Sequence, residues 1–118
     1  MAQDIRPRRS VLYMPGSNAR AMEKAKTLAA DALILDLEDA VAPDAKVMAR
    51  EQVIDAVNNG GYGPREVVVR VNGPATPWHA VDLAAAAASS AQAVLLPKVE
   101  GAGQVRAAAA QLPDGMDL

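Results

Sequence analysis

Pairs of polar side chains, spaced two residues apart, follow three short apolar runs of this chain. The pairs are Asp36 with Glu38, Arg70 with Asn72, and Lys98 with Glu100. Side chains alternate across a β-strand, so residues two apart share one face. Carboxylate oxygens are ligands that Mg²⁺ prefers, and a guanidinium group can bind a carbonyl or carboxylate oxygen. If the three pairs lie close together at one end of the sheet, they predict a site that binds a metal and an oxygen-rich substrate. The alternative is that they are salt-bridged strand ends without chemical consequence.

Several other catalytic and binding motifs are absent from the sequence. There is no cysteine, which excludes disulfides, thiolate metal sites and a cysteine nucleophile. The first expected strand–helix turn reads PGSNAR, with a single glycine where a dinucleotide fingerprint needs G-x-G-x-x-G, and no Walker phosphate loop is present. The one histidine, His79, is expected to be a surface or capping group rather than a ligand or base.

Four apolar runs and four helix-forming stretches alternate along the chain. The expected strands cover residues 12–16, 33–39, 67–72 and 94–100. The expected helices cover residues 19–30, a stretch from 43–44 to 58–61, a stretch that begins at 76–77, and residues 102–112. On the second helix, Val47, Ile54 and Val57 are expected to form one face. This alternation predicts an α/β fold with parallel strands buried by crossover helices. Periodicity alone leaves open a doubly wound sheet or half of a (β/α)₈ barrel.

Length and composition favour one globular domain over residues 1–118. The chain is 51% hydrophobic and 22% charged, with a net charge of −2, which argues against nucleic acid as the main partner. The basic cluster of Arg6, Arg8 and Arg9 is expected to be a solvated arm before the first strand. We expect no membrane partner and a cytoplasmic location, because no long uncharged apolar run is present.

Four stretches of the sequence together resemble one known enzyme family. They read RSVLYMPGSNARAMEKA, ADALILDLEDAVAPDAKVMAR, VVVRVNG and AVLLPKVEGAGQVR, in this order. Over residues 9–112 the chain is similar to the HpcH/HpaI aldolase and citrate lyase β-subunit family, and within it to the CitE-like branch that acts on acyl-CoA thioesters. The resemblance implies a TIM (β/α)₈ barrel, of which this chain would be the first half, with about four βα units.

The same resemblance implies a chemistry, a cofactor and a set of site residues. Family members use Mg²⁺ to cleave or form a carbon–carbon bond next to a thioester carbonyl. The expected function is therefore a lyase that acts on a 3-hydroxyacyl-CoA thioester such as malyl-CoA or citramalyl-CoA. For magnesium, the resemblance implies Glu100 as a direct ligand, together with Asp36. For catalysis, it implies Arg70, which binds the reacting oxygen, with Glu38 and Asp39. Arg20 and Lys24 are expected to bind the coenzyme A phosphates.

The chain also departs from the family pattern. Members carry a second aspartate ligand after the fifth strand, and several take their general acid/base from a neighbouring subunit. Neither element is in this sequence, so we expect the chain to be the N-terminal portion of such an enzyme, to end before the fifth strand and to lack turnover alone. The complete enzyme is expected to be a homo-oligomer. The open alternatives are a malyl-CoA thioesterase, a citrate lyase subunit acting on a carrier-bound citryl group, and a non-catalytic half-barrel that associates with itself.

Overall fold

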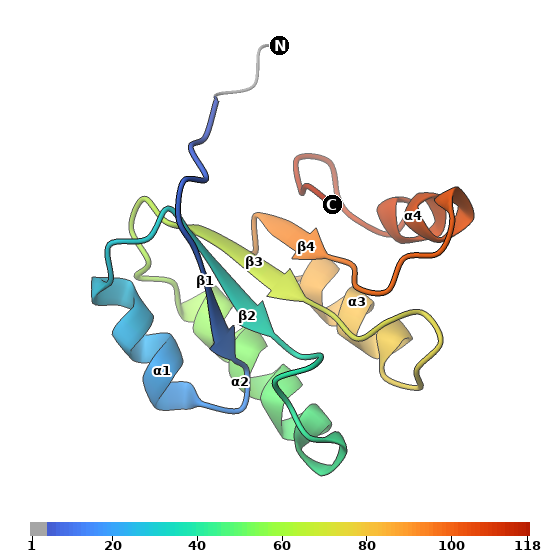
Figure 1. Ribbon diagram of the computed structural model, residues 1–118, viewed down its shortest axis with the longest axis horizontal. Helices are drawn as coiled ribbons and strands as arrows, with labels where there is room; N and C mark the ends of the chain where they lie inside the picture. Colours follow the sequence, from blue (N-terminus) through green and yellow to red (C-terminus); the bar gives the residue numbers. More distant parts are fainter. Residues whose placement is uncertain (1–4) are drawn as a thin grey trace.

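Strands and helices alternate along the computed structural model, which describes residues 5–118 (Figure 1). The strands are β1 (Val11–Pro15), β2 (Ala32–Asp36), β3 (Glu66–Arg70) and β4 (Ala93–Leu95). The helices are α1 (Ala19–Lys24), α2 (Lys46–Asn59), α3 (His79–Ala87) and α4 (Ala102–Ala109). Short 3₁₀ turns at Ala25–Thr27 and Pro43–Ala45 follow α1 and precede α2. The four predicted strand–helix units are confirmed, and each strand ends earlier than predicted.

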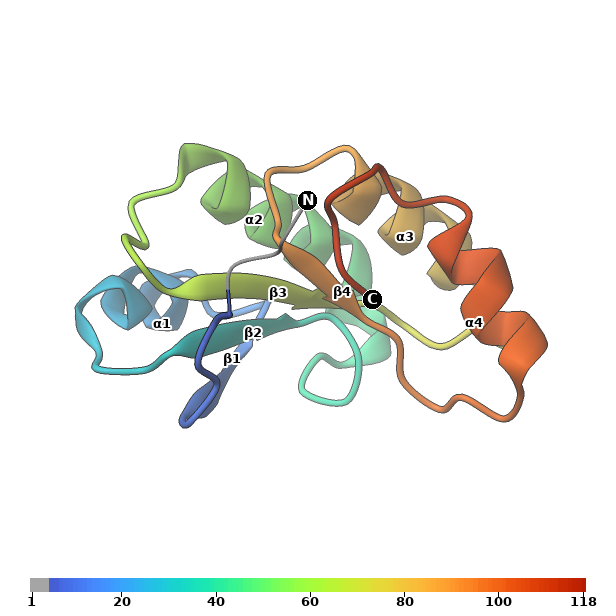
Figure 2. The same ribbon diagram turned by 90° about the horizontal axis from the view of Figure 1, so that it is seen from above.

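The four strands form one parallel sheet in the order β1-β2-β3-β4. Helices α1, α2 and α3 lie behind this sheet in Figure 1, whereas α4 lies beyond β4, beside the sheet (Figure 2). Spatial order equals chain order, so the described sheet lacks the reversal that marks a doubly wound fold. The predicted α/β class is therefore confirmed in its barrel-like form. Within residues 5–118, none of the helices combines the length and the apolar character needed to span a bilayer.

The core lies between the sheet and the helices, and it corrects two details of the predicted helices. On α2 the buried face is formed by Ala49, Val53 and Val57, while Val47 is 55% exposed. Of the predicted face, Val57 is buried, but Val47 lies six residues before Val53, which places it about 120° around the helix from the buried face. Helix α3 begins at His79 instead of residues 76–77, because the Thr76 hydroxyl turns back to donate to the Gly73 carbonyl at 2.8 Å.

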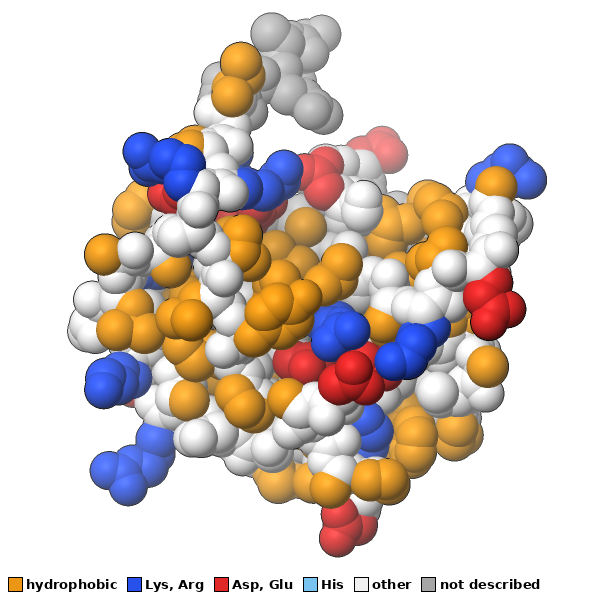
Figure 3. All heavy atoms as spheres, in the orientation of Figure 1, with side chains coloured by type: hydrophobic (Ala, Val, Ile, Leu, Met, Phe, Trp, Pro, Cys, Tyr) orange, Lys and Arg blue, Asp and Glu red, His pale blue; other side chains and the backbone are white. Residues whose placement is uncertain are grey.

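The opposite face of the sheet carries apolar side chains that α1, α2 and α3 leave uncovered (Figure 3). The strand register places side chains in rows across this face. The middle row is Tyr13, Ile34, Val68 and Ala93, and the row at the carboxyl ends is Pro15, Asp36, Arg70 and Leu95. Residues paired in register on parallel strands point to the same side. The register therefore sets the carboxylate of Asp36 beside the guanidinium of Arg70, at the edge where the strands end.

The segment that follows α4 pairs with the outer edge of β4. The Val94 N–H donates to the carbonyl oxygen of Asp117 at 2.9 Å, and the Asp117 N–H donates to that of Gln92 at 3.1 Å. The bridge between Ala93 and Asp117 is parallel. Asp117 therefore occupies the place that a fifth parallel strand would take.

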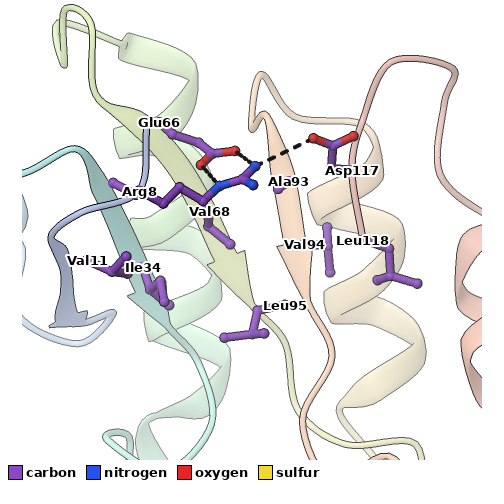
Figure 4. A pocket seen from close by; sticks show the side chains of 11 residues that line it. Arg8, Val11, Ile34, Glu66, Val68, Ala93, Val94, Leu95, Asp117 and Leu118 are labelled. Carbon is purple, nitrogen blue, oxygen red and sulfur yellow. Dashed lines mark hydrogen bonds and ion pairs between the residues drawn. The ribbon is translucent and has the colours of Figure 1, made fainter. Parts of the chain in front are cut away.

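Arg8 and Arg9, before β1, are exposed, as expected of a solvated arm, but each of them also forms an ion pair with a carboxylate of the sheet region. The Arg8 guanidinium donates two hydrogen bonds, of 2.6 and 2.8 Å, to the buried carboxylate of Glu66 (Figure 4). This hydrogen-bonded pair holds the pKa of Glu66 below its usual value. Arg9 pairs with Asp31 at 3.0 Å. Both pairs lie at the amino-terminal end of the sheet, opposite the edge that carries Arg70.

The Asp31 carboxylate should make the stability of the chain depend on pH. Its pKa falls from 3.8 to about 2, chiefly through the hydrogen bond from the Arg9 side chain and then the one from the Arg9 N–H. A group with a lowered pKa in the folded state stabilises that state above its unfolded pKa and loses this effect as the pH falls through its folded pKa. We expect the free energy of unfolding to decrease between pH 3.8 and about 2, and to decrease less in Asp31→Asn.

Urea unfolding at several pH values measures this difference. Asp44→Asn is a matched control, because Asp44 is exposed and forms no ion pair with the described residues. Equal slopes of stability against pH in the unmodified chain and in Asp31→Asn would contradict the assignment.

Gly16 allows the chain to turn closely after β1. A Cβ atom at this position would lie 2.7 Å from Cγ2 of Val53 and 2.8 Å from the carbonyl oxygen of Asp36. Overpacking of this kind typically costs about 1–3 kcal/mol, so Gly16→Ala should lower the free energy of unfolding by that amount. At Gly103 in α4, a Cβ would meet nothing within 4 Å, and Gly103→Ala should raise it by about 0.5–1 kcal/mol. Urea midpoints of the two variants that shift in the same direction would contradict this explanation.

Candidate functional site

The carboxylate of Asp36 shapes the loop that follows β2. Its Oδ1 accepts the N–H of Glu38 at 2.8 Å, and its Oδ2 accepts the N–H of Ala40 at 3.2 Å. Asp36 itself is 2% exposed. The two hydrogen bonds bend the chain so that the side chains of Glu38 and Asp39 come within reach of β3. We call residues 36–40 the acidic loop.

Arg70, the last residue of β3, faces all three carboxylates of the acidic loop. Its Nη1 lies 3.5 Å from Oδ2 of Asp36, and its Nη2 lies 3.1 Å from Oε1 of Glu38 and 4.0 Å from Oδ2 of Asp39. The guanidinium also lies 5.7 Å from the centre of the Tyr13 ring, a cation–π contact. The structure thus brings together four of the predicted site residues, around a cation whose side chain is 19% exposed.

Lys98 adds a second cation to the acidic loop. Its Nζ lies 3.2 Å from Oε2 of Glu38 and 3.5 Å from Oδ1 of Asp39. The Glu38 contact first, and then the charge of Asp39, raise the pKa of Lys98. The pKa of Asp39 is lowered, by the Glu38 side chain first and then by Lys98 and Arg70. Lys98 has a φ of 57°, a left-handed conformation that is rare for a lysine and that occurs preferentially at functional sites.

Asn72 does not share a face with Arg70, contrary to the prediction. Its N–H and its Nδ2 donate to Oδ2 of the buried Asp82 at 3.0 and 2.6 Å. Asp82 in turn forms an ion pair with Nε of Arg50 at 2.7 Å, and the Asn72 carbonyl lies 2.8 Å from Nδ1 of His79. The alternation rule fails here because β3 ends at Arg70, before Asn72. His79 is half-buried, and it contacts the Asn72 backbone carbonyl.

Glu100 is not among the carboxylates that form ion pairs with Arg70 within residues 5–118. Because β4 ends at Leu95, Lys98 and Glu100 belong to a loop, and strand alternation does not place them on one face. Glu100 is exposed, and its backbone N–H donates to Oε1 of Gln104 at 2.7 Å. It does line, together with Glu38, Lys98 and Gln104, a cavity of about 300 Å³ between the loops that follow β3 and β4. Glu100 and the acidic loop therefore border the same space.

The donors among residues 5–118 do not by themselves make a magnesium site. Within residues 5–118, no three Asp, Glu or His side chains are grouped so as to hold a metal. Both oxygens of Asp36 accept backbone N–H groups, and Glu38 is paired with Arg70 and Lys98. Magnesium is usually held by one or two carboxylates together with waters and substrate oxygens. Of the two predicted metal residues, Glu100 is the one whose carboxylate is open, and it would need ligands from elsewhere.

Arg20 and Lys24 lie on α1, the helix that follows β1. Both are exposed, and no ion pair joins either of them to the acidic loop within the described part of the chain. The structure does not bring Arg20 and Lys24 into contact with Arg70 or the acidic loop. Their contact with coenzyme A phosphates stays a prediction.

Three residues around the site were missed by sequence reasoning. Lys46 is buried and donates to the carbonyl oxygens of the acidic loop, Asp82 is buried behind β3, and Tyr13 lies against Arg70. A lysine in the first turn of a helix and an aspartate in another ordinarily remain in water. Tyr13 gave the one usable signal, since it stands one row below the strand ends and an aromatic ring there can support a cation.

Sequence comparison gives matches along nearly the whole chain. A profile of the HpcH/HpaI aldolase/citrate lyase family matches residues 9–115. A (3S)-malyl-CoA thioesterase of Cereibacter sphaeroides is 52% identical over 114 residues, which are 97% of this chain and 40% of the relative. An L-malyl-CoA/beta-methylmalyl-CoA lyase of the same species is 42% identical over 109 residues, 90% of this chain and 34% of the relative. The chain thus spans about 40% of the length of the thioesterase that it matches.

Solved structures give the same result for the fold. CitE from Mycobacterium tuberculosis, in complex with magnesium, acetoacetate and coenzyme A, matches with a TM-score of 0.70 and 38% identity, over 87% of this chain and 38% of that protein. RipC from Yersinia pestis matches with a TM-score of 0.67 and 27% identity, over 92% of this chain and 42% of that protein. The four strand–helix units are therefore a partial (β/α)₈ barrel.

Proposed function

Since the chain belongs to the HpcH/HpaI aldolase/citrate lyase family, we propose that it forms the part of a CoA-thioester enzyme that carries Arg70 and the acidic loop. The substrate would be a 3-hydroxyacyl-CoA of the malyl type. The proposal is carried by one observation: a partly buried guanidinium, at the carboxyl ends of parallel strands, faces three carboxylates and borders the uncovered sheet face. Active sites of (β/α)₈ barrels lie at this edge.

Hydrolysis of the thioester is the reaction that the relatives favour, because the thioesterase shares 52% of its residues with this chain and the lyase 42%. In this reaction water attacks the thioester carbonyl carbon, the carbon–sulfur bond breaks, and coenzyme A leaves as its thiol. Negative charge collects on the carbonyl oxygen, and Arg70 would stabilise it. Asp39, whose side chain is 65% exposed, is our candidate to accept the proton of the water.

Carbon–carbon cleavage is the second candidate, supported by the lyase relatives and by the likeness to CitE. A base removes the proton of the 3-hydroxyl group, the bond between C2 and C3 breaks, and its electron pair forms an enolate on the thioester oxygen. The products from malyl-CoA would be glyoxylate and, after protonation, acetyl-CoA. Arg70 would again stand beside an oxygen that gains negative charge, so the same residue serves both reactions.

Magnesium enters this proposal through the CitE structures that contain it. When bound, it would act as a Lewis acid toward substrate oxygens. Glu100 is the residue of this chain that we propose for its coordination, with Asp36 in a supporting position. The described donors do not complete a magnesium site, and the proposed role of Arg70 does not depend on the metal.

A chimera tests the proposed function. It joins this chain to the C-terminal part of the Cereibacter sphaeroides (3S)-malyl-CoA thioesterase that has no counterpart here. We expect the 118-residue chain to be inactive and the chimera, supplied with Mg²⁺ and malyl-CoA, to release free coenzyme A thiol. Release of glyoxylate with acetyl-CoA would instead select the lyase. A folded chimera that forms neither product, while the intact thioesterase is active in the same assay, would refute the proposal.

A further inference from the structure

Lys46, the first residue of α2, has a buried ammonium group. Its Nζ donates to the carbonyl oxygens of Leu37 at 3.0 Å and of Glu38 at 2.6 Å, and it lies 5.3 Å from the centre of the Trp78 ring. The residue is 7% exposed. No carboxylate of residues 5–118 forms an ion pair with it. Lysine is almost never this buried unless its charge is satisfied, and here the partners are backbone dipoles and a π-face.

The two carbonyl groups that Lys46 binds belong to the acidic loop. The same loop is held from its other side, because Asp36 accepts the Glu38 N–H at 2.8 Å and the Leu37 N–H donates to the Arg70 carbonyl at 2.9 Å. Lys46 thereby fixes the peptide groups on either side of the Cα atom of Glu38. From this Cα atom the Glu38 side chain reaches Nη2 of Arg70 at 3.1 Å.

Trp78 extends this connection to the neighbouring unit of the barrel. It is the N-cap residue of α3, and the loop that precedes it lines the cavity shared by Glu38 and Glu100. The attraction between a cation and an aromatic ring is stronger when the cation is removed from water. The contact therefore joins the loop after β2, the start of α2 and the start of α3 at one point.

We propose that Lys46 is a positioning residue for the Arg70 site. By binding the carbonyl oxygens of Leu37 and Glu38, it holds the Glu38 carboxylate in place against the guanidinium of Arg70, without touching the substrate itself. The effect on turnover rests on the proposed function, whereas the effect on the loop does not.

Amide hydrogen exchange in the 118-residue chain tests the effect on the loop. Lys46→Met keeps the length of the side chain but removes the charge and all donors. We expect exchange of the Glu38 and Ala40 amides, which donate to Asp36, to become at least about tenfold faster, since a bond to a charged group is lost. The Gln92 amide, which donates to the Val67 carbonyl at the far end of the sheet, should keep its rate.

Two further variants separate positioning from general stability. Lys26→Met is the matched control, because Lys26 also lies over an aromatic ring, 5.4 Å from the centre of Tyr62, but it is bonded to Glu23 instead of the acidic loop. It should leave the Glu38 and Ala40 amides unchanged. Lys46→Arg retains charge and donors and should keep most of their protection. Equal acceleration of all three amides in Lys46→Met, or unchanged protection at Glu38, would overturn the proposal.

The chimera supplies the functional readout. Lys46→Met should lower kcat by about tenfold, with a smaller change in KM, because a mispositioned Glu38–Arg70 pair weakens stabilisation of the transition state. Normal turnover with lost loop protection would overturn the positioning role while leaving the proposed function intact. A wild-type chimera without turnover would instead refute the proposed function, and the exchange result would still decide whether Lys46 holds the loop.

Discussion

Replacing Arg70 with alanine in the chimera should lower kcat/KM for malyl-CoA by about 10²–10³-fold, the usual effect of removing one donor to a developing oxyanion. The physical reason is the position of its guanidinium, beside three carboxylates and 5.7 Å from the centre of the Tyr13 ring. The loss should appear for either product, because hydrolysis and carbon–carbon cleavage both place negative charge on the thioester oxygen. Initial rates of coenzyme A release and glyoxylate formation measure it.

Two variants make the Arg70 prediction specific. Arg70→Lys keeps the charge but replaces a planar fork by a point charge, so its activity should lie between those of the wild type and Arg70→Ala. Arg106→Ala removes an exposed arginine of α4 and should have no effect. Urea unfolding of each variant distinguishes lost catalysis from lost structure. A folded Arg70→Ala chimera with undiminished turnover would show that Arg70 does not stabilise the negative charge on the thioester oxygen.

Replacing Asp82 with alanine should cost about 3–5 kcal/mol of stability, the typical effect of removing one partner of a buried ion pair. Asp82 is 1% exposed and accepts hydrogen bonds from Arg50 at 2.7 Å and from the N–H and Nδ2 of Asn72 at 3.0 and 2.6 Å. The alanine variant would leave the Arg50 guanidinium, whose side chain is 15% exposed, without its carboxylate. Since whole domains are stable by only about 5–15 kcal/mol, this loss would remove a large part of the free energy of unfolding.

The free energy of unfolding in urea measures the Asp82 effect. Asp55→Ala on α2 is the control, because this aspartate is exposed and its removal should change the stability by no more than about 0.5 kcal/mol. Asp82→Asn, which keeps one acceptor oxygen, should be less destabilised than Asp82→Ala. Similar urea midpoints for Asp82→Ala and Asp55→Ala would show that the network around Asp82 adds little.

The sequence predicted the fold and the centre of the site for the same physical reason. Apolar runs that stop at polar residues identify parallel strands and their carboxyl ends, and such ends meet along one edge. This logic correctly placed Asp36, Glu38 and Arg70 together. It failed for Asn72, because β3 ends at Arg70. It does not determine where Glu100 points, because β4 ends at Leu95, although Glu100 lines the same cavity as Glu38.

The residues that support the site could not be predicted by such rules. The burial of Lys46 depends on the positions of two loops, and that of Asp82 on how α3 packs against α2 and the end of β3. Both are tertiary outcomes, and at either position the local sequence is equally compatible with a solvated charge. The sequence pattern also does not determine which reaction occurs, because one oxygen-binding cation can serve either hydrolysis or carbon–carbon cleavage.

The first residue after each of the first three strands donates its N–H to the last residue of the next strand. These hydrogen bonds run from Gly16 to Asp36 at 2.8 Å, from Leu37 to Arg70 at 2.9 Å and from Val71 to Leu95 at 3.2 Å. The strand ends are thereby locked to one another before any loop begins. Loops beyond these anchor points could then be exchanged between relatives, or lengthened by evolution, without shifting Asp36 or Arg70. Substrate range could thus diversify by loop grafting while the oxygen-binding cation stays where the backbone put it.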